Sequence, residues 1–324
     1  MQLTFYTVWM IYFLVKNFKI PIMKVAKNVF KSQVKFFGII ALCFFLVSFS
    51  NKKEKNDWEG FRLNGEVKKL KEIRYHVKDK FGIIEKETKI DSTEFIFNEF
   101  GYLLVMDFGE SKFVYKLSDD NKIEVNTWYN AGGGILSVDI HKYNHRGNNF
   151  EVDYCNSDGS IIIKKISKYN KRDNLIEEKR YSNGTLIRKN IYDDNENEIE
   201  EINYDSDGTI FQRMIYKYDD MGNISGIKSY NSSESVIGRW TMKYDMNGNE
   251  IERIAVIENQ NVHLVFHKKY DEKNNLIQEI EIDNGLETVK NFIYEFDKKG
   301  NWIKKIEYEN HIPKYIIERE IEFY

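Results

Sequence analysis

The stretch Lys217 to Asn223, KYDDMGN, decides the fold because it returns along the chain. Related stretches occupy 243–249 (KYDMNGN), 269–275 (KYDEKNN) and 295–301 (EFDKKGN). With the aromatic residue of each copy in register, successive copies lie 26, 23, 26, 26, 26 and 26 residues apart. A fixed period of this length is typical of a repeat array. The marker aromatics are Tyr143, Tyr169, Tyr192, Tyr218, Tyr244, Tyr270 and Phe296.

Each copy has the residues of a tight hairpin turn. Asp219 suits the first position of a type I turn, and Gly222 suits the left-handed residue that follows, which predicts a hairpin loop with a bulge. Asn223 is expected to hold the bend through local hydrogen bonds. Glu196 replaces this glycine in one copy, which predicts a locally looser or differently built turn there. The other residues assigned a structural role in these turns are Asn148, Asn174, Asn197, Asp245, Gly248, Asn249, Asp271, Asn275, Asp297, Gly300 and Asn301.

The segments between turns alternate between apolar and polar residues. Val236, Trp240 and Met242 fall on one face of such a segment, while Arg239 and Lys243 fall on the other. Alternation bounded by turn residues predicts half-buried antiparallel strands. A second turn in each unit, about fourteen residues before the next marker, makes two strands per repeat. We therefore predict an all-β domain over 65–324, an antiparallel meander of about eighteen to twenty strands that forms a long twisted or curled sheet.

The motif Tyr-Asp-x-x-Gly-Asn, as in Tyr218 to Asn223 and Tyr244 to Asn249, resembles the YD repeat of the RHS and teneurin-like families. The resemblance covers about residues 95–324 and, more loosely, 65–94. It implies β-hairpins that coil into a spiral strip, which in large members forms a hollow shell around a toxin. In this chain Asn follows the Gly where Arg is common in the family. The family's C-terminal core and self-cleavage region is not recognisable either. We therefore expect a short, exported YD-repeat protein without a toxin cargo.

The N-terminal segment has the pattern of an export signal. From Met23 a lysine-rich stretch precedes an apolar run of about fifteen residues, so 23–50 is interpreted as a signal peptide or a membrane anchor. Residues 1–22 are either an upstream artefact of the start site or an additional hydrophobic helix, and 51–64 are interpreted as a linker. We expect a protein of the periplasm, cell surface or secreted fraction that meets the membrane only through this segment.

Charge and cysteine content exclude some classes of function. Residues 1–55 carry nine Lys and one acidic residue, so their formal net charge is +8. The formal net charge of the whole chain is −3, and residues 56–324 therefore carry −11. An acidic body does not fit a nucleic-acid partner, because phosphate binding depends on clustered cations. Cys155 is the single cysteine of the body, so no internal disulfide is expected there.

Candidate chemical sites are explained better by the repeat. The pairs His141/His145 and His263/His267 would lie about 13 Å apart on a strand, too far to share a metal ion. Gly132 to Gly134 fall in a hairpin loop and lack the lysine of a phosphate-binding loop. Asp205 to Gly208 lack the acidic ligand that a calcium loop needs at its twelfth position. We predict no catalytic residues, no metal and no cofactor, and hence no enzyme.

The leading hypothesis for function is a non-enzymatic binding or structural scaffold of the cell envelope that recognises an unknown protein or a glycan. Two alternatives belong to other classes. One is an immunity-type partner of a secreted toxin, and the other is a hydrolase with a site in the concavity of the sheet, which would need convergent groups with shifted pKa values. The sequence leaves the oligomeric state open.

Overall fold

The computed structural model describes residues 56–258 and 262–324. These residues form twenty strands and the short helix α3, Asp57–Gly60. The strands are β1 Val67–Lys80, β2 Ile83–Phe97, β3 Leu103–Asp107, β4 Ser111–Leu117, β5 Ile123–Asn130, β6 Ile135–Tyr143, β7 Asn149–Asn156, β8 Ile161–Tyr169, β9 Leu175–Ser182, β10 Thr185–Tyr192, β11 Glu198–Tyr204, β12 Ile210–Tyr218, β13 Ile224–Asn231, β14 Val236–Tyr244, β15 Glu250–Ile257, β16 Val262–Tyr270, β17 Leu276–Asp283, β18 Leu286–Phe296, β19 Trp302–Glu309 and β20 Ile312–Phe323.

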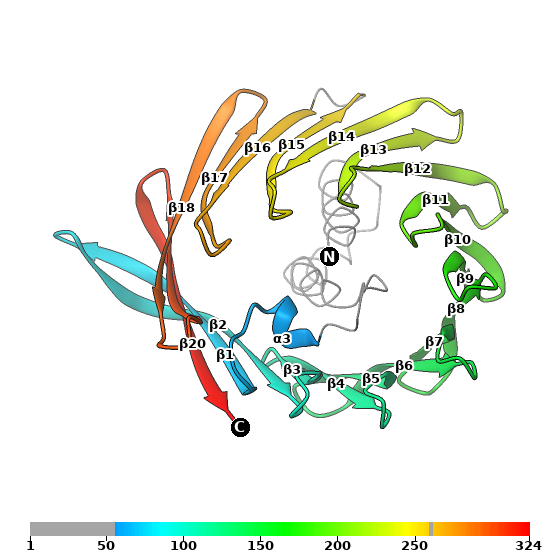
Figure 1. Ribbon diagram of the computed structural model, residues 1–324, viewed down its shortest axis with the longest axis horizontal. Helices are drawn as coiled ribbons and strands as arrows, with labels where there is room; N and C mark the ends of the chain where they lie inside the picture. Colours follow the sequence, from blue (N-terminus) through cyan, green and yellow to red (C-terminus); the bar gives the residue numbers. More distant parts are fainter. Residues whose placement is uncertain (1–55, 259–261) are drawn as a thin grey trace, which may run out of the picture. The chain divides into compact units, whose positions relative to one another are not determined.

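The strands follow one another around a closed antiparallel barrel (Figure 1). Every strand pairs with its neighbours in the sequence, and β1 also pairs with β20, from Val67 opposite Phe323 to His76 opposite Tyr315. The prediction of an all-β antiparallel meander as a long twisted or curled sheet was therefore wrong about the sheet's final form, because its two ends meet. Closure pairs the N–H and C=O groups that two edge strands of an open ribbon would leave exposed.

The two faces of the sheet differ in burial. On β14, Trp240 and Met242 are 6% and 3% exposed, whereas Arg239, Thr241 and Lys243 on the opposite face are exposed. Side chains converge on the concave side of a closed sheet and diverge on its convex side. The face of Trp240 and of the marker tyrosines is therefore the interior face, and the face of Lys243 is the exterior face.

The seam between β1 and β20 is fastened by side chains on the interior face and at the rim. Asn64 donates its backbone N–H to Asn301 Oδ1 at 2.6 Å, and Asn301 Nδ2 donates to the Asn64 carbonyl at 3.1 Å. Arg319 binds Glu72 Oε1 through Nε and Nη2 at 2.8 and 2.7 Å. These contacts join residues more than 230 positions apart in the sequence.

The repeated turns have one geometry. In the Tyr218 repeat, Asp219 N–H donates to the Asn223 carbonyl at 2.8 Å, and Gly222 has φ of +82°, where a side chain would be strained. Glu196 adopts φ of +63°, and its N–H donates to the Asp193 carbonyl at 3.0 Å, as the glycine does elsewhere. The prediction of a locally looser or differently built turn at Glu196 was wrong, because this residue accepts the left-handed conformation.

Five of the six marker tyrosines link their hairpin to the preceding one, while Tyr192 donates to Glu178 Oε2 at 3.0 Å. The hydroxyl of Tyr218 donates to the Glu198 carbonyl at 2.7 Å, and Tyr143, Tyr169, Tyr244 and Tyr270 likewise bind the carbonyl 20 residues earlier. A buried hydroxyl that binds backbone satisfies both groups and fixes the spacing of neighbouring strands.

The chain divides into two compact units, 1–61 and 62–324, and the barrel is the second. The predicted segments 1–22 and 23–50 lie outside the described residues, and so do residues 51–55 of the predicted linker. Among the described residues, no helix is long and apolar enough to cross a membrane.

Candidate binding cleft

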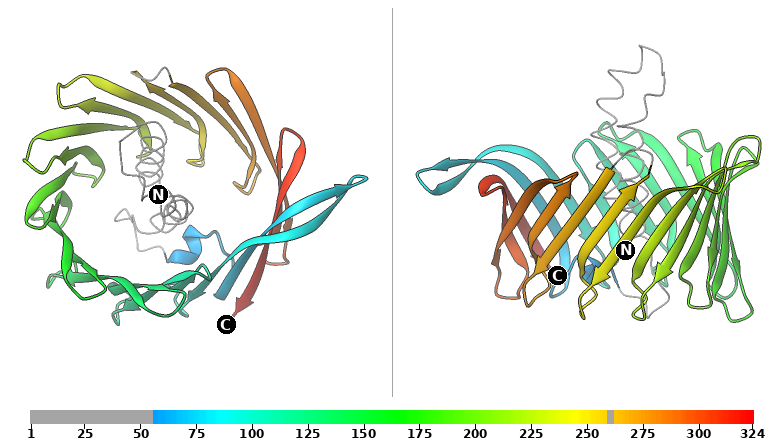
Figure 2. Two further views of the ribbon diagram at one scale, coloured as in Figure 1. Left: turned by 180° about the vertical axis from the view of Figure 1, so that it is seen from behind. Right: turned by 90° about the horizontal axis from the view of Figure 1, so that it is seen from above.

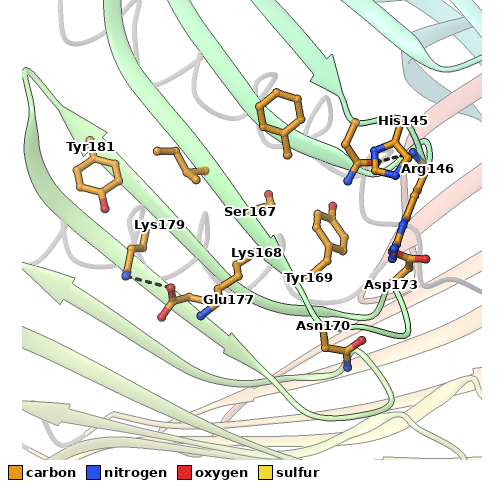
Figure 3. A pocket seen from close by; sticks show the side chains of 13 residues that line it. His145, Arg146, Ser167, Lys168, Tyr169, Asn170, Asp173, Glu177, Lys179 and Tyr181 are labelled. Carbon is orange, nitrogen blue, oxygen red and sulfur yellow. Dashed lines mark hydrogen bonds and ion pairs between the residues drawn. The ribbon is translucent and has the colours of Figure 1, made fainter.

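A cleft of about 550 Å³ lies on the exterior face where β7, β8 and β9 approach the turns that follow β6 and β8 (Figure 3). Its walls come from facing positions of two strands, because Lys168 lies opposite Glu177 and Ile166 opposite Lys179 in the β8–β9 ladder. The lining residues are Asn144, His145, Arg146, Phe150, Ile166, Ser167, Lys168, Tyr169, Asn170, Asp173, Glu177, Lys179 and Tyr181.

Two neighbouring turns form the rim of the cleft and are tied together. Asn144 Oδ1 accepts the backbone N–H groups of Arg146 and Asn148 at 2.9 and 3.0 Å, which fixes the first turn. Asp173 of the second turn accepts hydrogen bonds from Arg146 Nη1 at 2.9 Å and Asn148 Nδ2 at 3.1 Å. The rim is therefore held in place before any ligand arrives, which lowers the entropic cost of binding.

The charged groups on one wall are fixed in their charged forms. Glu177 forms ion pairs with Lys179 at 3.0 Å and with Lys189 at 3.1 Å. Burial tends to raise the pKa of Glu177, but the hydrogen bonds from both lysines outweigh it and lower that pKa below its usual value. The hydrogen bond to Glu177 raises the pKa of Lys179. Neither group is suited to exchange protons near neutral pH.

The remaining walls combine apolar surface with hydrogen-bonding groups. Phe150 and Ile166 are 36% and 40% exposed and supply the apolar part. Lys168 forms no ion pair within the described part of the chain, so its ammonium is available as a donor. Tyr169 lines the cleft from the end of β8, although its side chain is on the interior face. Burial raises the pKa of Tyr169 to about 12, and its hydroxyl is already used on the Asn149 carbonyl at 2.8 Å. Tyr181 extends this surface at the far end of the cleft (Figure 3).

A second polar cluster lies on the interior face of β9, β10 and β11. Asn190 pairs with Glu178 on one side and with Glu201 on the other, and its Nδ2 donates to Glu198 Oε1 at 2.5 Å. Burial, with the like charge of Glu201, raises the pKa of Glu198 to about 8. Burial tends to raise the pKa of Glu178 as well, but Lys165 at 2.7 Å outweighs it and lowers that pKa. The two carboxyl groups thus hold different protonation states near neutral pH.

The predicted turn residues lie at one rim of the barrel, because all of them belong to the turns that follow β6, β8, β10, β12, β14, β16 and β18. Tyr169 is the one among them that lines the cleft. Their side chains serve the repeat: Asn223, Asn249, Asn275 and Asn301 each donate to the aspartate of their own turn. The sequence did not reveal the cleft. Its signals were only the exposed apolar residues Phe150 and Ile166, which interrupt the polar pattern of the exterior face near two turns.

Several solved structures match part of the chain. No protein-family model matches it, and no curated protein does. The crystal structure of TcdB2-TccC3-TEV matches with a TM-score of 0.38 and 14% identity over 76% of this chain. The crystal structure of a porin-like protein from Bacteroides uniformis ATCC 8492 matches with a TM-score of 0.36 and 8% identity, covering 80% of this chain and 98% of that chain. TcdB2-TccC3 matches with a TM-score of 0.23 and 10% identity over 75% of this chain.

These similarities are low, and the chain spans only 14% of the length of the TcdB2-TccC3-TEV chain and 17% of the TcdB2-TccC3 chain. They carry no argument about activity, ligand or partner.

Proposed function

We propose that the protein is a non-enzymatic binding scaffold of the cell envelope and that it recognises a saccharide through the exterior cleft. The observation that carries this proposal is the composition of the cleft. Apolar surface from Phe150 and Ile166 lies beside free donors such as Lys168, and the charges of Glu177 and Lys179 neutralise each other. A ligand with both hydroxyl groups and apolar faces fits such walls better than a purely ionic or purely apolar one.

The protonation states of Glu177, Lys179 and Tyr169 fit binding better than catalysis by these three groups. Acid–base catalysis needs a group whose pKa lies near the working pH. The pKa of Glu177 is lowered, that of Lys179 is raised, and that of Tyr169 is raised to about 12. All three groups keep one charge state around neutral pH, which suits a site whose task is recognition.

The test is binding of a panel of neutral and acidic oligosaccharides to the purified barrel, with Tyr181→Ala and Lys168→Ala as cleft variants. Tyr230→Ala is the matched control, because Tyr230 is an exterior residue of β13 remote from the cleft. We expect one saccharide class to bind with an affinity that each cleft variant lowers about tenfold. Saccharide binding that all three variants leave unchanged, or no saccharide binding at all, would refute the proposal.

One observation favours a second candidate, a hydrolase that acts from the interior face. Glu198, with a pKa of about 8, could donate a proton, while the lowered pKa of Glu178 keeps a carboxylate nearby. The test is hydrolysis of chromogenic glycosides by the wild type and by Glu198→Gln. Turnover that the variant abolishes would establish this candidate and exclude the non-enzymatic scaffold.

We propose further that the chain is exported and that it is a YD-repeat relative. The support for export is the lysine-rich and apolar order of 23–50, and the support for the family is the repeated turn with its tyrosine-to-carbonyl bond. Fractionation of a C-terminally tagged protein, with sequencing of its mature N-terminus, tests the export signal. An intact N-terminus on a cytoplasmic protein would contradict it.

A further inference from the structure

One interior position recurs in every repeat, nine residues after the marker aromatic. Its occupants range from apolar to acidic to basic: Val152, Glu178, Glu201, Ile227, Arg253, Glu279 and Lys305. All of them face the interior, because each lies in strand register with an interior residue of the preceding strand. Structurally equivalent interior positions of the barrel thus hold apolar, acidic and basic side chains.

Four of the five charged occupants have a counterion. Glu178 pairs with Lys165 at 2.7 Å, and Glu201 with Arg188 at 3.4 Å. Arg253 pairs with Glu250 at 2.7 Å, and Glu279 with Lys290 at 3.3 Å. The counterion in each case comes from a nearby interior position of the same or an adjacent strand. Pairing of this kind offsets the cost of removing a charge from water.

Lys305 is the exception within 56–258 and 262–324, because its ammonium forms no hydrogen bond or ion pair there. Its Nζ lies 5.3 Å from the centre of the Trp302 ring and 5.9 Å from that of Phe292. Burial lowers the pKa of Lys305 despite the attraction of Glu72 and Glu307, and the positive charges of Arg319 and Arg74 lower it further. Lys305 is half-buried, and an ammonium that is partly removed from water without a bound anion is costly unless an anionic ligand meets it.

Arg319 provides a second unused donor beside Lys305. Its side chain is 6% exposed, and its guanidinium lies 3.6 Å above the Trp302 ring. Nε and Nη2 bind Glu72, but Nη1 is buried and has no hydrogen-bond partner. A guanidinium edge of this kind is suited to bind carboxylate oxygens. Tyr294 completes the surface, with its ring 6.1 Å from Trp302 at an interplanar angle of 67°.

We propose that Lys305 and Arg319 form an anion site at the interior of the seam that binds a carboxylate carried on a ring-shaped ligand. The carboxylate supplies the missing acceptor for both cations, and the flat surfaces of Phe292 and Tyr294 accept the ring. Glu72 orients Arg319 from its other edge and fixes the position of Nη1. This site is separate from the exterior cleft, so it does not depend on the proposed saccharide binding.

The experiment is calorimetric titration of the full chain with two ring carboxylates, glucuronate and benzoate, and with their neutral analogues glucose and benzyl alcohol. The central variant is Lys305→Met, which keeps a similar volume and breaks no ion pair. The matched control is Lys304→Met, because Lys304 is the neighbouring exterior residue and pairs with Glu295 at 2.7 Å. Tyr181→Ala tests whether any binding belongs to the cleft instead.

We expect at least one acid to bind saturably while its neutral analogue does not, and Lys305→Met to weaken that binding at least about tenfold, or ~1.4 kcal/mol. Lys304→Met and Tyr181→Ala should leave it unchanged. Preference for glucuronate would identify a sugar acid, and preference for benzoate an aromatic acid. The proposal is refuted if neither acid binds up to about 10 mM, or if Lys305→Met binds as tightly as the wild type.

Discussion

Removal of the Asn301 side chain should weaken the closure of the barrel more than the same change in an equivalent turn. Asn301 is 1% exposed and forms three hydrogen bonds: it accepts from Asn64 N–H at 2.6 Å, and it donates to the Asn64 carbonyl at 3.1 Å and to Asp297 at 3.0 Å. At about 1 kcal/mol for each bond, Asn301→Ala should cost about 3 kcal/mol. For a domain of this size, that corresponds to a fall in Tm of about 6 to 12 °C.

The matched variant is Asn275→Ala, which occupies the same place in its own turn. Asn275 Nδ2 donates only to Asp271, at 2.9 Å to the nearer oxygen, so its loss should cost about 1 kcal/mol, or about 2 to 4 °C. Calorimetry gives both Tm values, and amide hydrogen exchange should show faster exchange along β1 and β20 in Asn301→Ala alone. Equal Tm shifts, or unchanged exchange at the seam, would show that Asn301 is an ordinary turn residue.

Three further changes have expected outcomes. The pKa of Glu198, raised to about 8, lies above its value of about 4.3 in the unfolded chain, so the folded state keeps a proton that the unfolded state loses and stability falls as pH rises from about 5 to 8. Glu198→Gln should flatten this fall in urea midpoints, and an equal fall in both proteins would contradict the pKa. Gly222→Ala, at φ of +82°, should lower the free energy of unfolding by about 1 kcal/mol without a new contact; an unchanged denaturation midpoint would show that the turn relaxes freely. Phe81, 107% exposed at φ of +57° on the tip of the β1–β2 hairpin that projects from the barrel (Figure 2), should be replaceable by Asn with a gain of about 0.5 kcal/mol, and a loss of Tm would mean that the ring has a contact in solution.

The features that depend on neighbours in the sequence were predictable. The alternation around Trp240 and the turn from Asp219 to Gly222 are local, so strand positions and the order of hairpins follow from one repeat. The predicted range of eighteen to twenty strands includes the number in the described residues. Glu196 shows the limit of such reasoning, because a turn held at both ends by the ladder can impose positive φ on a residue that rarely adopts it.

Closure was not predictable because it depends on residues that are distant in the sequence. Asn64 and Asn301 carry no local sign that they will meet, and Glu72 and Arg319 look like ordinary charges of an alternating strand. The outcome depends on how twist and curvature accumulate over twenty strands, and a small change per strand decides between an open coil and a ring. The cleft has the same origin, since its lining residues come from the turns after β6 and β8 and from three strands.

The repeat separates the residues that build the barrel from those that can vary. Strand spacing is set by backbone pairing, by the tyrosine-to-carbonyl bonds and by the Asn–Asp contacts of the turns, none of which uses the interior position nine residues after the marker. That position can therefore hold Val152 in one repeat, Glu178 in the next and Lys305 in the last without a change of strand register. An interior charge without a counterion lowers the free energy of unfolding, so the stability of the fold does not explain why such a charge is present. Binding specificity should therefore be sought at the interior charged residues that lack a counterion and not at the repeated Tyr-Asp-Gly-Asn sets.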